Sequence, residues 1–257
     1  MSDAVLYEMK GHVAVITINQ PDRRNALGIA VRQGLWDAWD RFEKDPEARV
    51  AILTGTGEKA FCAGMDLKEA GGADANSQGV NEFPAILSTI WTSPKPVVAK
   101  LAGPARAGGV GIVAACDIAI AARTATFAFT EVRIGVIPAV ISITVLPRLL
   151  PRAAHELFLT GETFDADRAV AVGLLNSSVP ADELDAEVAR YTGMLALGGP
   201  NALAATKQML RAPRPADLDA AFAEMLALSA GFFASAEGQE GITAFAQKRP
   251  PSWVPNA

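Results

Sequence analysis

The sequence predicts an α/β fold that ends in a helical region, and three observations lead to this prediction. Short apolar segments typical of buried strands recur between residues 5 and 138. Glycine-rich turns and short stretches with helical spacing separate these segments. From about residue 183 to residue 248 the chain is rich in alanine and poor in β-branched residues, a composition typical of helices.

The pattern of the first 55 residues predicts strand, strand, helix and strand. Residues 5–19 are apolar on both faces, as in strands buried within a layered fold, with a turn at Lys10 and Gly11. Residues 50–54 form a short apolar strand that Gly55 and Gly57 end. Between these strands, apolar side chains follow helical spacing at Leu27, Val31, Leu35, Trp39 and Phe42.

The middle of the chain repeats this order at shorter spacing. Residues 83–91 predict a short helix closed by two prolines, and strands are expected at 97–101, 117–121 and 127–129. This recurrence favours a spiral of strand-strand-helix turns over long βαβ units. A boundary near residue 197 then divides the chain into a core, 1–197, and a helical region, 198–257, whose apolar faces need a partner.

Composition excludes several classes of protein. Half of the 257 residues are hydrophobic and the net charge is −5, which disfavours a dedicated nucleic-acid binder. The two cysteines and two histidines do not have the spacing of a metal site, so neither a metal nor a disulfide framework is expected. No stretch reaches the roughly 18 apolar residues of a membrane span, and we expect a cytoplasmic protein.

Two glycine-containing turns could present backbone N–H groups to a ligand. Residues 60–67 (AFCAGMDL) follow a strand, and the plainer interpretation is a tight turn with Asp66 as a helix cap. Residues 103–111 (GPARAGGVG) open a helix after another strand, so its free N–H groups could face an oxyanion. A dinucleotide site is the competing interpretation, but the helix before the next strand is too short for the usual crossover.

Glu131 is a single carboxylate in very apolar surroundings. It lies within residues 129–138 (FTEVRIGVIP). A buried carboxylate has a raised pKa and can transfer protons near neutral pH. An ion pair with Arg133 or a solvated position at a strand edge would explain the residue equally well, and composition does not separate these interpretations.

Five motifs, in their order along the chain, resemble the crotonase superfamily, the enoyl-CoA hydratase/isomerase family. Residues 19–27 (NQPDRRNAL) resemble its N-terminal CoA loop, and residues 61–67 resemble its first oxyanion segment. Residues 94–99 with 103–118 resemble its second oxyanion segment. Residues 130–138 are similar to its second catalytic-glutamate segment, and residues 240–250 (EGITAFAQKRP) resemble its C-terminal signature. The resemblance implies a crotonase-like spiral with a C-terminal helical trimerisation region.

The resemblance also implies roles for individual residues. Met65 and Gly108 would each offer a backbone N–H to the thioester oxygen of an acyl-CoA substrate, and Glu131 would be the acid/base at the acyl chain. Coenzyme A would enter as part of the substrate, with no separate cofactor. Contacts to the substrate are expected from Arg24, Ala26, Ala63, Gly64, Asp66, Leu67, Phe245 and Lys248.

One position departs from the family pattern. Hydratases with two glutamates carry the first of them at the position of Gly111. The remaining carboxylate could serve an enoyl-CoA hydratase, which we favour because residues 109–111 and 130–141 look like the branch that includes bacterial methylglutaconyl-CoA-type hydratases. It could also serve an enoyl-CoA isomerase, and a non-catalytic acyl-CoA-binding subunit is the third hypothesis. By resemblance, a homotrimer or dimer of trimers is expected.

Overall fold

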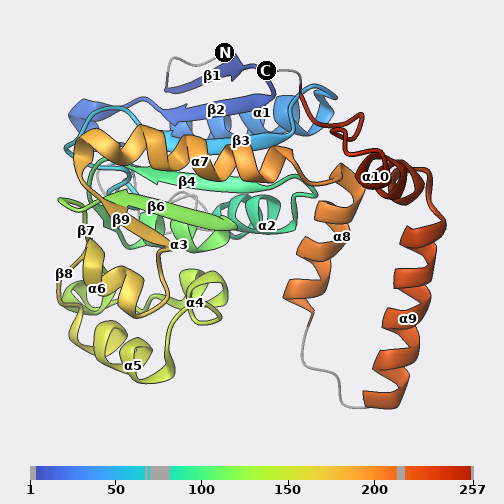
Figure 1. Ribbon diagram of the computed structural model, residues 1–257. Helices are drawn as coiled ribbons and strands as arrows, with labels where there is room; N and C mark the ends of the chain where they lie inside the picture. Colours follow the sequence, from blue (N-terminus) through green and yellow to red (C-terminus); the bar gives the residue numbers. More distant parts are fainter. Residues whose placement is uncertain (1–3, 67–68, 70–81, 213–217, 256–257) are drawn as a thin grey trace.

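The N-terminal hairpin begins the main sheet of the computed structural model, which describes residues 4–66, 69, 82–212 and 218–255 (Figure 1). β1 (Val5–Lys10) and β2 (Val13–Ile18) pair antiparallel through a turn at Gly11, whose φ of +60° favours glycine. The next strands add in parallel, in the order β1-β2-β3-β4-β6-β9. These strands are β3 (Val50–Gly55), β4 (Val97–Leu101), β6 (Ile118–Ala122) and β9 (Ser177–Val179).

Helices cover both faces of this sheet, which explains why its strands are apolar throughout. α7 (Leu184–Ala196) packs on one face, where Val98 and Ile120 meet Leu184 and Val188. The opposite face carries the larger core, and Figure 1 shows it covered by three helices that connect the parallel strands. They are α1 (Ile29–Lys44), α2 (Phe83–Thr92) and α3 (Gly108–Ala115).

A second, small sheet lies below the first in Figure 1, and its central strand leads into the segment of Glu131. Its order is β5-β7-β8, and buried phenylalanine rings stack behind it. The strands are β5 (Ala105–Arg106), β7 (Thr126–Ala128) and β8 (Phe164–Asp165). Three helices complete this layer: α4 (Ala139–Val145), α5 (Pro151–Thr160) and α6 (Ala166–Ala171). Short 3₁₀ helices lie at η1 (Pro21–Arg23), η2 (Thr130–Ile134) and η3 (Ala181–Glu183).

The predicted elements are mostly confirmed, with shifts at their ends. The helix expected from residue 27 begins at Ile29, because Leu27 instead forms a β-bridge with Met65. The strand expected at 117–121 runs from Ile118 to Ala122. α4 was not predicted, since its sequence (AVISITV) is rich in β-branched residues that favour strands.

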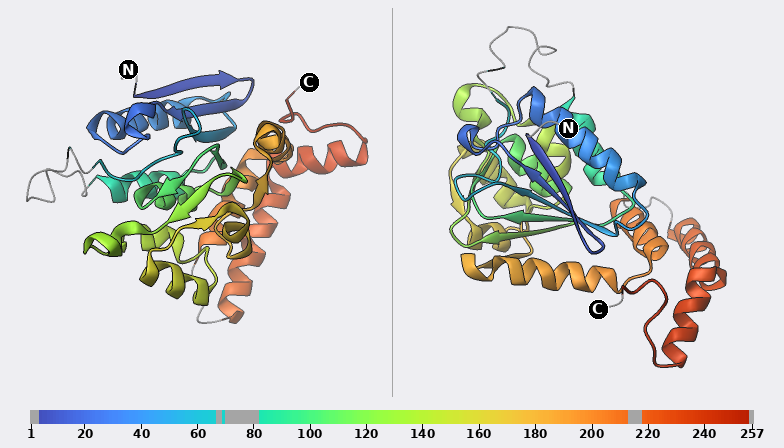
Figure 2. Two further views of the ribbon diagram at one scale, coloured as in Figure 1. Left: turned by 90° about the vertical axis from the view of Figure 1, so that its left-hand side faces the viewer. Right: turned by 90° about the horizontal axis from the view of Figure 1, so that it is seen from above.

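The helical end of the chain forms an arm that projects from the layered body (Figure 2). It contains α8 (Pro200–Arg211), α9 (Leu218–Ala234) and α10 (Ala236–Ala246). Arg49 ties the tail to the base of the arm, because its guanidinium donates hydrogen bonds to the carbonyls of Gly198 and Trp253. The division between residues 197 and 198 stays a prediction. No helix among the described residues is long and apolar enough to cross a membrane.

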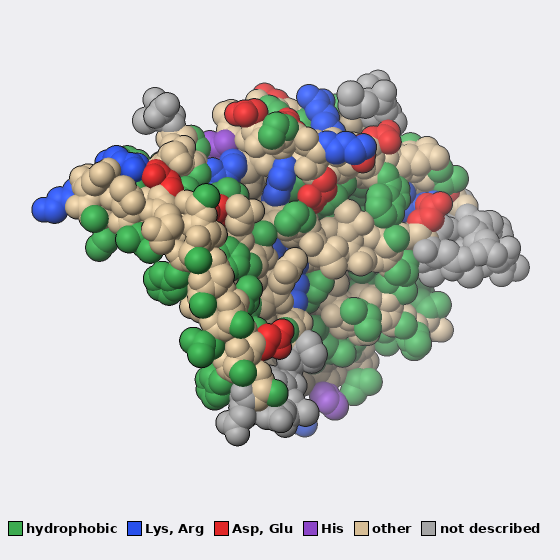
Figure 3. Space-filling view, turned by 90° about the vertical axis from the view of Figure 1, so that its right-hand side faces the viewer, with side chains coloured by type: hydrophobic (Ala, Val, Ile, Leu, Met, Phe, Trp, Pro, Cys, Tyr) green, Lys and Arg blue, Asp and Glu red, His purple; other side chains and the backbone are tan. Residues whose placement is uncertain are grey.

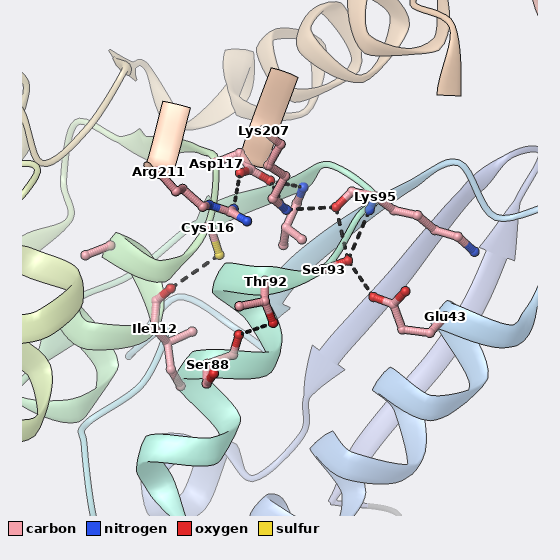
Figure 4. Close-up of polar contacts among 12 residues, drawn as sticks. Glu43, Ser88, Thr92, Ser93, Lys95, Ile112, Cys116, Asp117, Lys207 and Arg211 are labelled. Carbon is pink, nitrogen blue, oxygen red and sulfur yellow. Dashed lines mark hydrogen bonds and ion pairs between the residues drawn. The ribbon is translucent and has the colours of Figure 1, made fainter. Parts of the chain in front are cut away.

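A partly buried carboxylate fastens α8 to the body (Figure 4). Asp117, just before β6, lies 2.6 Å from the Lys207 ammonium and 2.8 Å from the Arg211 guanidinium. The Lys207 side chain is only 8% exposed, and it also donates to the Lys95 carbonyl at 2.9 Å. Asp117 in turn accepts the backbone N–H of Val97 at 2.8 Å, so one side chain connects the arm with two strands of the main sheet.

Asp117→Asn should lower the free energy of unfolding by about 3 kcal/mol, because it leaves the buried Lys207 and the partly buried Arg211 without their anionic partner. Asp40→Asn is the control, since Asp40 pairs with Lys44 on the exposed side of α1 and should change stability by less than about 0.5 kcal/mol. Urea denaturation of both variants measures the difference. Equal stabilities would show that Asp117 does not fasten the arm.

Candidate active site

Three loops meet at the carboxyl ends of β2, β3 and β4. The turn after β3 runs beside β5, where Cys62 bridges to Ala105 and the Arg106 N–H donates to the Cys62 carbonyl at 3.0 Å. The predicted CoA loop pairs with the other side of the same turn. There the Leu27 N–H donates to the Gly64 carbonyl at 2.8 Å. The structure therefore places the two predicted oxyanion segments and the CoA loop together.

Gly64 and Gly109 have no side chains, and this allows the turn after β3 to lie against the start of α3. Gly64 has a φ of +87°, and a Cβ there would lie 3.0 Å from the Arg106 carbonyl oxygen and 3.3 Å from the Gly108 nitrogen. A Cβ on Gly109 would lie 2.4 Å from the Cys62 carbonyl oxygen, closer than van der Waals contact. Glycine is thus required at both positions for the turn after β3 to rest on the start of α3.

The backbone N–H groups of Met65 and Gly108 are both available for a ligand. Gly108 is the first residue of α3, where the helix itself uses no N–H group. Among the described residues, neither N–H donates to a hydrogen-bond acceptor of the protein. Ala107, immediately before α3, has a φ of +47°, a strained value for a residue with a side chain. Phe83 and Leu27 surround Gly108 with apolar atoms.

Glu131 lies near these donors because β5 pairs with β7. Arg106 is opposite Ala128 in this pairing, and the Ala107 N–H donates to the Ala128 carbonyl at 3.1 Å. Glu131 follows three residues later, in η2. Its Oε2 is buried and has no hydrogen-bond partner among the described residues.

Burial raises the pKa of Glu131, and a hydrogen bond from its own backbone N–H only partly offsets this effect. The alternative of an ion pair with Arg133 is wrong within the described part of the chain. The Arg133 side chain is exposed and donates instead to the Thr160 carbonyl. The Glu131 carboxyl group therefore keeps its proton to a higher pH than an exposed glutamate does, which suits a group that takes up and releases protons.

Asn25 is a site residue that the sequence did not reveal. It is fully buried, its φ is +54°, and its side-chain amide donates to the carbonyls of Ala60 (2.7 Å) and Thr56 (3.2 Å). Its carbonyl oxygen accepts the Gln20 N–H at 2.9 Å. Asn25 therefore holds the CoA loop against the turn after β3. In the sequence, the one sign of this role is the position of Asn25 between Arg24 and Ala26, within the segment 19–27 that resembles the CoA loop.

The residues predicted for the CoA loop surround Asn25. Arg24 has a φ of +53°, its side chain is exposed, and its carbonyl accepts the Ala63 N–H at 3.1 Å. Ala26 is partly buried beside it. The exposed guanidinium of Arg24 is free to turn towards an anionic group, whereas the backbone of the loop is fixed.

The Asp66 carboxylate points into the protein. It is 8% exposed and pairs with Arg23 at 2.5 Å, and Arg23 also pairs with Glu69 at 2.5 Å. Glu69 in turn accepts the Ile29 N–H at the start of α1, and this hydrogen bond and those from Arg23 lower the pKa of Glu69. The helix-cap interpretation of Asp66 stays a prediction, because most of the backbone that such a cap would serve lies outside the described residues. Leu67 lies outside the described residues.

Phe245 and Lys248 are not brought to the site by this chain. Phe245 is 87% exposed at the end of α10, and Lys248 has a φ of +55° just beyond it. Figures 1 and 2 place α10 on the arm, away from α3.

Metal binding and thiol chemistry have no support in the described part of the chain. No group of three or more His, Cys, Asp or Glu side chains in that part could hold a metal ion. Cys62 is fully buried, and burial raises the pKa of its thiol to about 12, so it is not a reactive thiolate.

Glu131→Gln should stabilise the protein at about pH 8 and leave its stability unchanged at about pH 4. The folded-state pKa of Glu131 is raised, so the folded chain binds more protons than the unfolded chain between the two pKa values. Stability is consequently lost as the pH rises through this interval, whereas glutamine carries no charge to bury. Urea denaturation at both pH values tests this, and a variant less stable than the wild type at about pH 8 would contradict it.

Comparison with known proteins is consistent with this geometry. The family model for enoyl-CoA hydratase/isomerase matches residues 8–256. The chain is 34% identical over 257 residues to the (E)-benzylidenesuccinyl-CoA hydratase of Thauera aromatica, covering 97% of this chain and 98% of the relative. It is 33% identical over 260 residues to the carnitinyl-CoA dehydratase of Proteus mirabilis, covering 98% and 99%.

The fold agrees with that of solved structures. The enoyl-CoA hydratase of Bacillus anthracis superposes with a TM-score of 0.89 at 31% identity, covering 98% of this chain and 99% of the other. The family model, the relatives and the superposition all extend over nearly the whole chain. The chain belongs to the enoyl-CoA hydratase/isomerase family and has the crotonase fold.

Proposed function

We propose that this protein is an acyl-CoA hydratase that adds water across the 2-enoyl double bond of a coenzyme A thioester. The observation that carries the proposal is the Glu131 carboxylate, whose buried Oε2 has no hydrogen-bond partner among the described residues, in a segment that the β5–β7 pairing brings towards the start of α3. There the Gly108 N–H likewise has no acceptor among the described residues. The two relatives described above are named a hydratase and a dehydratase, which are the two directions of one reaction type.

The thioester oxygen accepts hydrogen bonds from the backbone N–H groups of Met65 and Gly108. Glu131 takes a proton from water, and the water oxygen forms a bond to C3 as the C2–C3 double bond opens. The electron pair moves to the thioester oxygen, where the two N–H groups stabilise the enolate. Loss of one such donor typically costs about 3–4 kcal/mol of transition-state stabilisation. Glu131 then returns the proton to C2, so one carboxylate serves both steps.

The CoA moiety is part of the substrate, and no separate cofactor takes part. Arg24, with its exposed guanidinium, is proposed to meet a phosphate group of CoA. The other proposed contacts are at Ala26, Ala63, Gly64, Asp66 and Leu67, with Phe245 and Lys248 approaching from the arm of a neighbouring subunit. Because the Asp66 carboxylate is paired with Arg23, we propose that Asp66 contacts the substrate through its backbone.

Glu131→Gln should abolish at least 99% of turnover on 2-enoyl-CoA thioesters, because glutamine cannot accept the proton from water (a loss of about 10²-fold or more). Glu162→Gln is the control, since Glu162 is exposed and lies outside the site. The assay follows loss of the conjugated chromophore, and mass spectrometry detects the added water.

Each other outcome of this assay supports a different function. Conversion of a 3-enoyl thioester into a 2-enoyl thioester without a change in mass would make the protein an isomerase that uses Glu131 alone. Tight binding of acyl-CoA without turnover by the wild type would make it a binding subunit. Unchanged turnover in Glu131→Gln would show that another group is the base.

The arm supports a further part of the proposal, that the protein assembles as a homotrimer or a dimer of trimers. Figure 3 shows hydrophobic side chains gathered along the arm. Phe222 is 71% exposed, Leu226 72% and Phe233 63%, and such a surface needs a covering partner. We also propose a cytoplasmic location and a place in fatty acid metabolism.

Light scattering should give a mass three or six times that of one chain. Phe222→Glu should lower this mass at micromolar concentration, because it places a charge within the covered apolar surface. Glu224→Gln, on the same helix, is the control for a change in charge. A wild-type monomer would contradict the proposed assembly.

A further inference from the structure

Gly111 and Ile141 fit together where α3 crosses α4. Gly111 is fully buried, and a Cβ there would lie 2.5 Å from Cγ2 and 3.0 Å from Cβ of Ile141. Ile141 is itself only 3% exposed. A β-branched side chain holds its Cγ2 close to its own backbone and has few rotamers, so Ile141 cannot move aside without moving α4.

A hydrogen bond fixes the two helices at the same point. The buried hydroxyl of Thr144, one turn along α4 from Ile141, donates to the Gly111 carbonyl at 3.1 Å. The backbones of α3 and α4 can come this close only because residue 111 has no side chain. The contact between Gly111 and Ile141 therefore fixes the distance between α3 and α4.

The Gly108 N–H belongs to α3, and the segment of Glu131, in η2, leads into α4. Gly108 starts α3 and lies one turn before Gly111. Glu131 precedes α4 by eight residues, and the linking chain turns back so that the Val136 N–H donates to the Glu131 carbonyl at 3.1 Å. A change in the α3–α4 spacing would thus alter the distance between the Gly108 N–H and the Glu131 carboxylate.

We infer that Ile141 is a positioning residue that, through its contact with Gly111, holds the Glu131 segment at working distance from the Gly108 N–H. The same contact leaves no space for a second carboxylate at position 111, so the site is built to work with one. This inference rests on the proposed function, since it assigns Glu131 and Gly108 their roles.

The test is a double-mutant cycle of Gly111→Ala and Ile141→Gly. The added methyl of Gly111→Ala collides with Ile141, whereas in the Ile141→Gly background the colliding atoms are gone. Two activities are measured: hydration of 2-enoyl-CoA, and exchange of the α-protons of a saturated acyl-CoA for deuterium. The exchange needs a base and an oxyanion donor but no addition of water.

Gly111→Ala alone should lower kcat for both activities by about 30- to 100-fold with KM changed less than threefold, as expected for a displacement of about 1 Å. In the Ile141→Gly background the same substitution should change kcat less than threefold. Ile141→Val keeps the methyl group that touches Gly111 and should retain most of the activity. Melting temperature is followed for every variant.

Gly193→Ala is the matched control. Gly193 lies on the exposed side of α7, and a Cβ there meets no atom within 4 Å, so activity should not change. A merely structural role for Gly111 predicts that kcat falls only in step with melting temperature. Positioning predicts that kcat at saturating substrate falls even at temperatures where the variant is fully folded.

Two results would overturn the inference. One is full kcat in Gly111→Ala, and the other is an equal loss of kcat in both backgrounds. A wild type that exchanges α-protons but does not hydrate would refute the proposed hydratase and still leave the cycle measurable by exchange. A wild type that does neither would refute both.

Discussion

The close approach of the turn after β3 to the first turn of α3 is the constraint on which the site depends. Two glycines permit it, and Asn25 holds the turn from the other side with buried hydrogen bonds. Once these backbones lie together, the N–H groups of Met65 and Gly108 have no acceptor among the described residues. Preorganised donors of this kind require no rearrangement when charge develops on a ligand, which is the basis of electrostatic catalysis.

Much of the fold follows from the sequence because its strands are short and apolar on both faces. The hairpin, β3 and β4 are short apolar runs bounded by turn residues, which favours strands, and helical spacing identified the buried face of α1 at Val31, Leu35 and Trp39. α4 escaped prediction because its residues favour strands, and its helical state depends on packing against α3. β8 and β9 have only two and three residues, too few for any periodicity.

Motifs in the sequence indicate which segments form the candidate site, whereas pairing between distant residues cannot be read from them. The motifs name Met65, Gly108 and Glu131 as candidates, and the structure places the segments that carry them side by side. The partner of Asp66 lies 43 positions earlier, at Arg23, and no local pattern reveals that the carboxylate faces inwards. The unpartnered oxygen of Glu131 and the contact between Gly111 and Ile141 are likewise properties of three-dimensional packing.

The buried Cys62 bears on how this protein would respond to chemical attack. Its thiol adjoins the backbone that forms the site, yet burial raises the pKa of the thiol to about 12, so the thiolate is scarce at neutral pH. Alkylating agents and peroxides react with the thiolate, and they would also have to reach a fully buried sulfur. Cys62 should therefore resist oxidation and alkylation, and inhibitors of the site would have to act without a covalent bond to its sulfur.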